Sequence, residues 1–150
     1  MLRKTRTAIA ALALAAMTLI SLAFVASPAQ AATNPYTPQG VCGSGYSIVT
    51  HVALTSLSSN RTTATVYLLK KGGWRCAVTM KSSATAGNKN WIYTAIGDES
   101  GVEKKSEGGH FKYYAGPKKL YVGTGKFDCA RAYGGYDNGP YTMSTSTVCK

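Results

Sequence analysis

Acidic side chains are scarce in this sequence, which has six Asp and Glu residues against 17 Lys and Arg. Four of the six lie within 97–108, so the sequence does not indicate the rigid pair of opposed carboxylates that sugar-cleaving enzymes use. Its two histidines, His51 and His110, are far apart, and no C-x-x-C pair accompanies them. Glycine-rich nucleotide motifs are also missing. We therefore expect neither a cofactor nor a metal.

One segment superficially resembles the nucleophile motif of chymotrypsin-like proteases, Gly-Asp-Ser-Gly-Gly. The segment is Gly97-Asp98-Glu99-Ser100-Gly101, in which Glu99 shifts the serine by one position. Between His51 and Ser100 the sole aspartate is Asp98, and the chain is too short for two six-stranded barrels. We therefore expect a protein that is not an enzyme.

The amino terminus has the pattern of a cleavable signal peptide. Three basic residues precede an Ala/Leu-rich run from about residue 7 to 26, and Ala29-Gln30-Ala31 gives the small-residue pattern that signal peptidase cleaves. An uncleaved membrane anchor is the alternative. We expect cleavage after Ala31, a secreted, extracellular protein, and membrane contact through the transient signal peptide alone.

The basic excess belongs to the exported part of the chain. Without the three basic residues of the leader, 14 basic residues face six acidic ones, a net charge of +8. Such a charge favours contact with polyanions such as teichoic acids, and a solubility surface is the alternative. Because exported proteins rarely meet nucleic acid, we expect an anionic cell-wall polymer or spore surface as partner.

From residue 41 onward, short runs of β-branched and aromatic residues alternate with Gly, Asn, Ser and Lys, and no helical period of useful length is present. The pattern predicts a single all-β domain over 41–150, a small disulfide-stapled β-sandwich or barrel of about seven or eight short antiparallel strands. Residues 32–40 are expected to form an extended lead-in. The expected strands are 46–53, 62–70, 74–81, 90–97, 110–114, 118–124, 127–133 and 141–149.

A β-hairpin is predicted where Gly72-Gly73 joins two of these strands. On the second strand, the period of two places Trp74, Cys76, Val78 and Met80 on one face, which we expect to be core. Arg75, Thr79 and Lys81 are expected on the opposite face. Further turns are expected at Gly108-Gly109, Gly116-Pro117, Gly134-Gly135 and Asn138-Gly139-Pro140, and an exposed charged loop over 97–108.

All four cysteines lie in the exported part, and an even number in an oxidising compartment predicts two disulfides. Four cysteines allow three connectivities, among which the sequence does not choose. An inward Cys76 needs an inward partner, which favours Cys129. We therefore expect Cys76–Cys129, with Cys42–Cys149 joining the two ends of the domain.

A cationic aromatic stretch at 111–121 is the remaining candidate for binding. Tyrosine rings can stack on sugars while neighbouring lysines meet anionic groups. The alternative is that the tyrosines fill a thin core and the lysines face solvent. The candidate polyanion- or glycan-binding residues are Lys112, Tyr113, Tyr114, Lys118, Lys119 and Tyr121.

Several segments in order resemble the spore-associated protein A family, small secreted proteins of filamentous, spore-forming actinobacteria. The matching pieces are Val41-Cys42-Gly43-Ser44-Gly45-Tyr46, Thr65-Val66-Tyr67-Leu68, Cys76-Ala77-Val78-Thr79, Tyr113-Tyr114-Ala115-Gly116-Pro117, Leu120-Tyr121-Val122, Cys129 before Gly134-Gly135, and Cys149. The chain differs from the family where Ala130-Arg131 replaces an Asp-Trp pair. The resemblance implies a disulfide-bonded, non-enzymatic protein of the spore or aerial-hypha surface, with no catalytic residues to assign.

The sequence therefore predicts a secreted, non-enzymatic structural or binding protein retained on the spore or cell envelope by its basic charge. The alternative is a secreted enzyme inhibitor or antimicrobial protein that acts through the exposed loop at 97–108.

Overall fold

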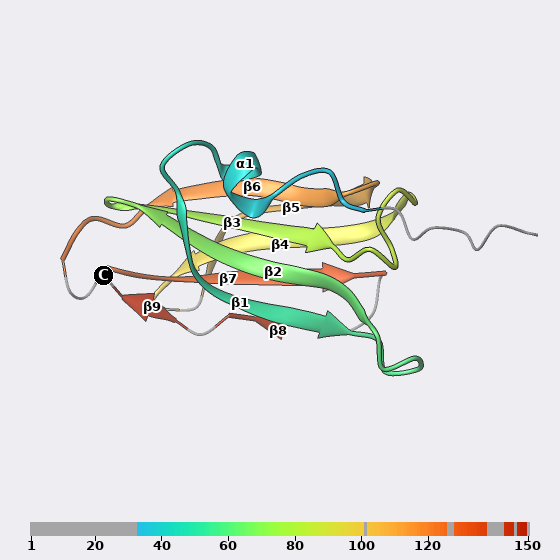
Figure 1. Cartoon of the computed structure of the whole chain (residues 1–150). Helices are drawn as coiled ribbons and strands as arrows, with labels where there is room; N and C mark the ends of the chain where they lie inside the picture. Colours follow the sequence, from blue (N-terminus) through green and yellow to red (C-terminus); the bar gives the residue numbers. More distant parts are fainter. Residues whose placement is uncertain (1–32, 101, 126–127, 138–142, 146, 150) are drawn as a thin grey trace, which may run out of the picture.

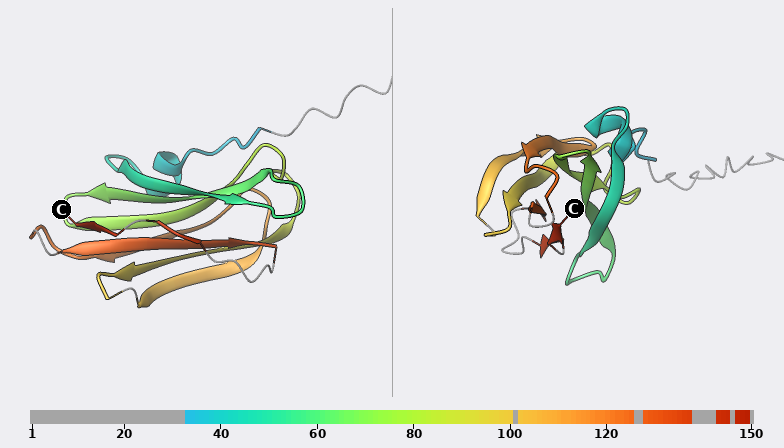
Figure 2. Two further views of the ribbon diagram at one scale, coloured as in Figure 1. Left: turned by 90° about the horizontal axis from the view of Figure 1, so that it is seen from below. Right: turned by 90° about the vertical axis from the view of Figure 1, so that its left-hand side faces the viewer.

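The computed structural model of this protein describes residues 33–100, 102–125, 128–137, 143–145 and 147–149. These residues form one short helix and two antiparallel sheets that lie against each other as the layers of a sandwich (Figures 1 and 2). The expected all-β, disulfide-stapled fold is thus confirmed. The expected signal peptide, 1–31, lies outside the described residues. Within the described ranges, no helix has the length and apolar character to cross a membrane.

The first sheet has the strand order β1-β2-β3-β6, and the second has the order β5-β4-β7-β8, with β9 also paired to β7. The first sheet comprises β1 (Ser47–Thr55), β2 (Thr62–Lys71), β3 (Trp74–Lys81) and β6 (Tyr114–Tyr121). The second comprises β4 (Asn90–Asp98), β5 (Glu103–Phe111), β7 (Cys129–Tyr136), β8 (Met143–Ser144) and β9 (Val148–Cys149). The helix α1 spans Pro38–Cys42.

The main core lies between the two sheets. Val66 and Leu68 of β2 and Ile92 and Ile96 of β4 belong to one buried cluster, and each aliphatic side chain removed from water contributes about 1.5–3 kcal/mol. The sheets approach closely at Gly134 of β7, where a Cβ would lie 2.3 Å from Val66 Cγ2. The turn expected at Gly134-Gly135 is wrong, since this pair lies inside β7. Glycine is needed at position 134 because the facing sheet leaves no space for a side chain.

β3 is buried on both faces, which corrects the sequence expectation. Thr79 and Lys81, on the face opposite the row expected to be core, are 0% and 3% exposed. They share the face of Ala77, which packs into the main core. The Lys81 ammonium donates to the carbonyl oxygens of Asn88 and Phe111, each at 2.6 Å. Burial lowers the pKa of Lys81, while the nearby Asp137 carboxylate acts to raise it.

The opposite face of β3 forms a second core that faces away from the other sheet. Cys76, Val78 and Met80 are buried there together with Cys42 and Leu69. Figure 2 shows α1 on this outer side of the first sheet. Trp74 begins the same row, but it is 45% exposed, so its expected place in the core is wrong.

Residues 33–42 are attached to the domain instead of forming a simple extended lead-in. The Asn34 amide donates to the carbonyl oxygens of Lys81 and Tyr113, at 3.1 and 2.9 Å. α1 begins after Thr37, whose hydroxyl accepts a hydrogen bond from the Gly40 amide as an N-cap. The segment thereby covers one end of the outer face of β3.

The disulfides join Cys42 to Cys76 and Cys129 to Cys149. Both expected pairings are therefore wrong. Cys76 does point into a core, as expected, but this is the core beneath α1 and not the core between the sheets. Cys129 and Cys149 lie opposite each other on paired strands β7 and β9. The bridges close loops of 34 and 20 residues, and each contributes roughly 3–4 kcal/mol in the chain-entropy model.

The charged loop expected over 97–108 is largely a strand. β5 pairs with β4 from Asn90↔Phe111 to Gly97↔Glu103 and forms an edge of the second sheet. Gly108, expected in a turn, lies beneath Trp91 and Tyr93, whose ring atoms would be 3.3 Å from an added Cβ. Charged side chains are common on edge strands, where they oppose pairing with other chains. The Trp91 and Tyr93 rings of β4 pack over Gly108, which has no side chain to cover this part of the sheet.

The remaining strands agree with the sequence to different degrees. The four expected between residues 46 and 97 correspond to β1–β4, with end points within two residues. The strand expected at 110–114 is wrong, because the connection between β5 and β6 lies there, while 118–124 and 127–133 overlap β6 and β7. The expected strand at 141–149 overlaps β8 and β9. Gly72-Gly73 forms the predicted turn, Gly116-Pro117 lies at an irregularity within β6, and 138–140 is outside the described residues.

Peptide mapping of the protein under non-reducing conditions tests the disulfide pairs. We expect one linked peptide pair that contains Cys42 and Cys76, and a second that contains Cys129 and Cys149. A linked pair containing Cys76 and Cys129 would contradict the fold described above.

The close approach at Gly134 predicts a large effect of one added methyl group. Gly134→Ala is expected to lower the free energy of unfolding by about 1–3 kcal/mol, because Val66 and Thr79 leave no space for it. Urea denaturation measures the change. Gly108→Ala on edge strand β5 is the control, and an equal or larger loss in that variant would contradict the packing described.

Candidate functional site

The six candidate binding residues do not form one site. Lys112, Tyr113 and Tyr114 line one hollow, whereas Lys119 lines another, beside Tyr121. Lys118 lines neither of the two. The two hollows lie at opposite ends of β6, and the alternation of the strand sends Lys118 to the face opposite that of Lys119. The stretch is continuous in sequence but divided on the surface.

One hollow, which we call the basic hollow, is lined by Tyr46, Lys71, Trp74 and Lys119 and has a volume of about 340 Å³. The Lys119 ammonium lies 5.3 Å from the centre of the Tyr46 ring, in cation–π contact. Lys71 donates to the Ser44 carbonyl oxygen at 3.0 Å. Burial raises the pKa of Tyr46, so its phenol stays neutral beneath the ammonium. Within the described part of the chain, no acidic side chain lines this hollow.

Two exposed aromatic rings extend the basic hollow along the end of the first sheet. Trp74 and Tyr121 are register partners on β3 and β6, and their ring centres are 5.3 Å apart in an edge-to-face arrangement. They are 45% and 61% exposed. Trp74 was expected in the core and was therefore not among the candidate binding residues. Its position directly after the Gly72-Gly73 turn was the one feature of the sequence that could have indicated its exposure.

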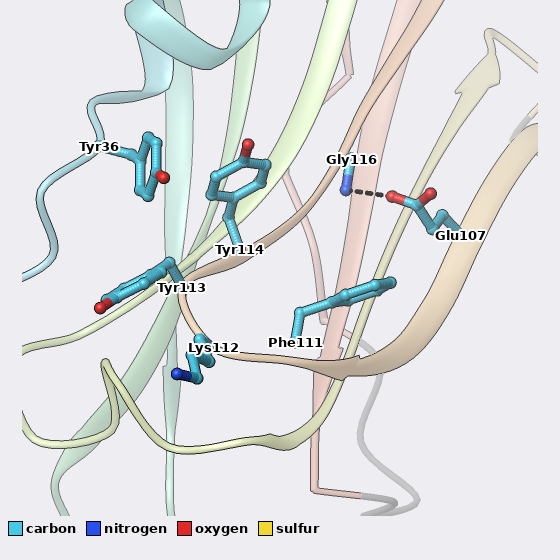
Figure 3. Close-up of a pocket in the computed structure, with 7 residues that line it drawn as sticks. All are labelled: Tyr36, Glu107, Phe111, Lys112, Tyr113, Tyr114 and Gly116. Carbon is cyan, nitrogen blue, oxygen red and sulfur yellow. Dashed lines mark hydrogen bonds between the residues drawn. The ribbon is translucent and has the colours of Figure 1, made fainter.

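The other hollow, which we call the aromatic hollow, lies at the connection between β5 and β6 and also measures about 340 Å³. Its lining residues are Tyr36, Glu107, Phe111, Lys112, Tyr113, Tyr114 and Gly116. Figure 3 shows the three tyrosines on one side and Glu107 with Gly116 on the other. The Tyr36 ring contacts those of Tyr113 and Tyr114, with centres 5.5 and 5.1 Å apart. Asn34 fixes this arrangement, because it holds the segment that carries Tyr36.

Glu107 connects the edges of the two sheets and removes one lysine from the candidate set. Its carboxylate accepts a hydrogen bond from the Gly116 amide at 2.7 Å and lies 3.4 Å from the Lys118 ammonium. Lys118 is therefore neutralised by an ion pair, whereas no carboxylate pairs with Lys71 or Lys119 among the described residues. Sequence alone gave no signal for this pairing.

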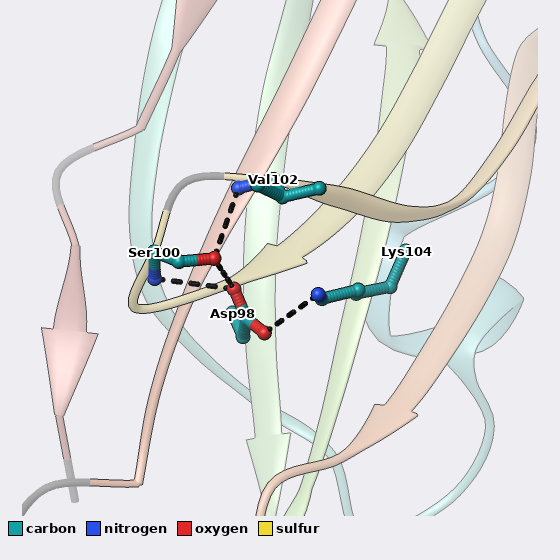
Figure 4. Close-up of polar contacts among 4 residues, drawn as sticks. All are labelled: Asp98, Ser100, Val102 and Lys104. Atoms are coloured by element: carbon teal, nitrogen blue, oxygen red, sulfur yellow. Dashed lines mark hydrogen bonds and ion pairs between the residues drawn. The ribbon is translucent and has the colours of Figure 1, made fainter.

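The described residues of the protease-like segment, 97–100, run from the end of β4 into the connection to β5. In Figure 4 the Asp98 carboxylate accepts hydrogen bonds from the hydroxyl and the amide of Ser100 and pairs with Lys104 at 3.0 Å. The Ser100 hydrogen bond and then Lys104 hold the pKa of Asp98 below its usual range. His51 instead stacks on Tyr67 in the first sheet, with ring centres 5.6 Å apart. The short connection here offers a smaller contact surface than the twelve-residue loop expected for an inhibitor.

A third hollow of about 350 Å³ is lined by Tyr121 and Lys104, among other residues. Asp98, Glu99 and Asp128 are among its lining residues. Over the described ranges, no group of three or more His, Cys, Asp or Glu side chains is arranged to hold a metal ion.

Comparison of the chain with protein-family models, with curated proteins and with solved structures finds no match. Assignment of a function therefore depends on the geometry of the two hollows and on the sequence resemblance given above.

The Glu107 contacts predict a difference between two substitutions. Glu107→Ala is expected to lower the free energy of unfolding by about 1–2 kcal/mol, because the Gly116 amide loses its acceptor and Lys118 its partner. Glu107→Gln keeps an acceptor and is expected to cost less than about 1 kcal/mol. Hydrogen exchange of the Gly116 amide provides a local readout. Unchanged protection in the alanine variant would contradict the contact.

Proposed function

We propose that this protein is a secreted, non-enzymatic binding protein that attaches to an anionic glycan polymer of the cell envelope or spore surface. The attachment uses the basic hollow and the exposed rings beside it. The net charge of +8 in the expected mature chain raises the rate of encounter with such a polymer, and the hollow positions it.

The observation that carries this proposal is the chemistry of the basic hollow. Exposed Trp74 and Tyr121 present flat apolar rings, on which sugar rings can pack. Lys71 and Lys119 supply two ammonium groups beside these rings, and no carboxylate of the described residues neutralises them. Two cations and the Trp74 ring in one hollow, with the Tyr121 ring beside it, match a ligand in which sugar units carry phosphate or carboxylate groups.

Two further observations support an extracellular role. The two disulfides suit an oxidising compartment and stabilise a domain of modest size. The segments that resemble the spore-associated protein A family include Tyr46, Tyr121 and the four cysteines, and that resemblance implies a spore-surface protein without catalytic residues.

Retention on the producing cells tests the proposal. We expect the tagged protein to remain with cells or spores at about 0.01 M salt, where the Debye length is about 30 Å. It should be released at about 1 M salt, where charges are screened beyond about 3 Å. A protein found wholly in the medium at low salt would contradict envelope attachment.

Purified walls, intact or stripped of their anionic polymer, then test the basic hollow. Trp74→Ala and Lys119→Gln should each weaken binding to intact walls on the order of tenfold, about 1.4 kcal/mol. Leu57→Ala, which truncates an exposed side chain elsewhere, and Lys105→Gln on β5 are the matched controls. Equal binding by all four variants would show that the charge of the whole protein, and not the hollow, mediates attachment.

A further inference from the structure

The basic hollow and the aromatic hollow lie at opposite ends of the same pair of strands. Trp74 pairs with Tyr121 at one end of β3 and β6, and Met80 pairs with Tyr114 at the other. Met80 lies six positions after Trp74 along β3, which corresponds to about 20 Å at the rise of a β-strand. A ligand in contact with both hollows must therefore extend over about this length.

Segment 33–42 covers the outer face of the first sheet between the two hollows, and its Tyr36 forms part of the wall of the aromatic hollow. α1 is bonded to β3 through Cys42 and Cys76, two residues from Trp74 and four from Met80. Edge strand β6 runs from one hollow to the other, and Pro117 is exposed on it. The edge thus connects the two hollows.

The two hollows differ in charge. Among the described residues, the basic hollow has two ammonium groups and no carboxylate. The aromatic hollow has one ammonium group, that of Lys112, and one carboxylate, that of Glu107, which pairs with the neighbouring Lys118. Each Glu107 oxygen has one partner, so the carboxylate keeps lone pairs that can accept hydrogen bonds from hydroxyl groups. A wall of tyrosine rings opposite such a carboxylate fits an uncharged sugar unit.

We infer that the two hollows bind one extended anionic saccharide chain. The basic hollow holds a phosphate or carboxylate group, and the aromatic hollow holds an uncharged sugar unit about 20 Å further along. This inference rests on the proposed function and names its ligand class: a polymer, in preference to its short fragments. Once one hollow is occupied, the second contact becomes intramolecular, so a chain that spans both binds more tightly.

A length series tests the inference. Size-fractionated oligogalacturonates supply carboxylate groups, and size-fractionated teichoic acid with sugar-substituted repeats supplies phosphate groups. Binding to the wild-type protein is measured calorimetrically at low salt. We expect affinity per mole of chain to rise on the order of tenfold or more once a chain exceeds about 20 Å. The series that shows this step identifies the anionic group.

Variants separate the contributions of the two hollows. Tyr36→Ala, in the aromatic hollow, should abolish the increase in affinity for chains longer than about 20 Å. It should leave the affinity of the protein for short chains unchanged. Glu107→Gln keeps the Gly116 acceptor and tests the carboxylate without loss of the strand contact. Trp74→Ala should weaken the binding of both short and long chains. Leu57→Ala is again the control, and circular dichroism verifies that each variant is folded.

The outcomes distinguish the inference from the proposed function. A gradual increase with length, or an unchanged step in Tyr36→Ala, would overturn the two-hollow inference and leave envelope attachment standing. Absence of binding to any chain would overturn both. Single-stranded DNA of the same length and charge is the remaining comparison, and equal affinity for it would overturn the assignment of a saccharide ligand.

Discussion

Burial of β3 on both faces is the constraint on which the rest of this structure depends. A two-layer sandwich covers one face of each sheet, but the outer face of β3 carries Cys76, Val78 and Met80, all buried. Their exposure to water would cost about 1.5–3 kcal/mol for each large apolar side chain. The fold therefore needs a third layer. α1, with five residues, is too short to form alone, and its covalent bond to Cys76 holds it in place.

This small cover also determines where binding is possible. Because α1 has only five residues, the aromatic residues at the ends of β3 and β6 remain partly open to solvent. The Asn34 hydrogen bonds extend the cover to the β5–β6 connection and bring Tyr36 against two further tyrosines. Segment 33–42 therefore contributes both to stability, because it covers the second core, and to the candidate site, because its Tyr36 forms part of the wall of the aromatic hollow.

Local pattern predicted the first half of the fold well and the second half poorly. Regular alternation identified β2 and β3 almost to the residue. β5 was missed, because its glycine pair and its charges are typical of a turn, and the rings that compensate for Gly108 come from another strand. The predicted disulfide pairs were wrong for a related reason. The alternation of β3 correctly placed Cys76 on a buried face. Nothing in the neighbouring sequence shows that α1 covers this face and supplies the partner Cys42.

The candidate site shows the same limit at the level of single side chains. Lys118 and Lys119 are neighbours in sequence, yet one is paired with Glu107 and the other lies over Tyr46 without a carboxylate. Composition predicted the charge of the surface but not which cations remain unneutralised. That distinction arises from cross-strand and cross-sheet neighbours, as does the contact between Trp74 and Tyr121. The overall positive field can attract any polyanion, so selectivity depends on the few lysines that lie beside exposed rings.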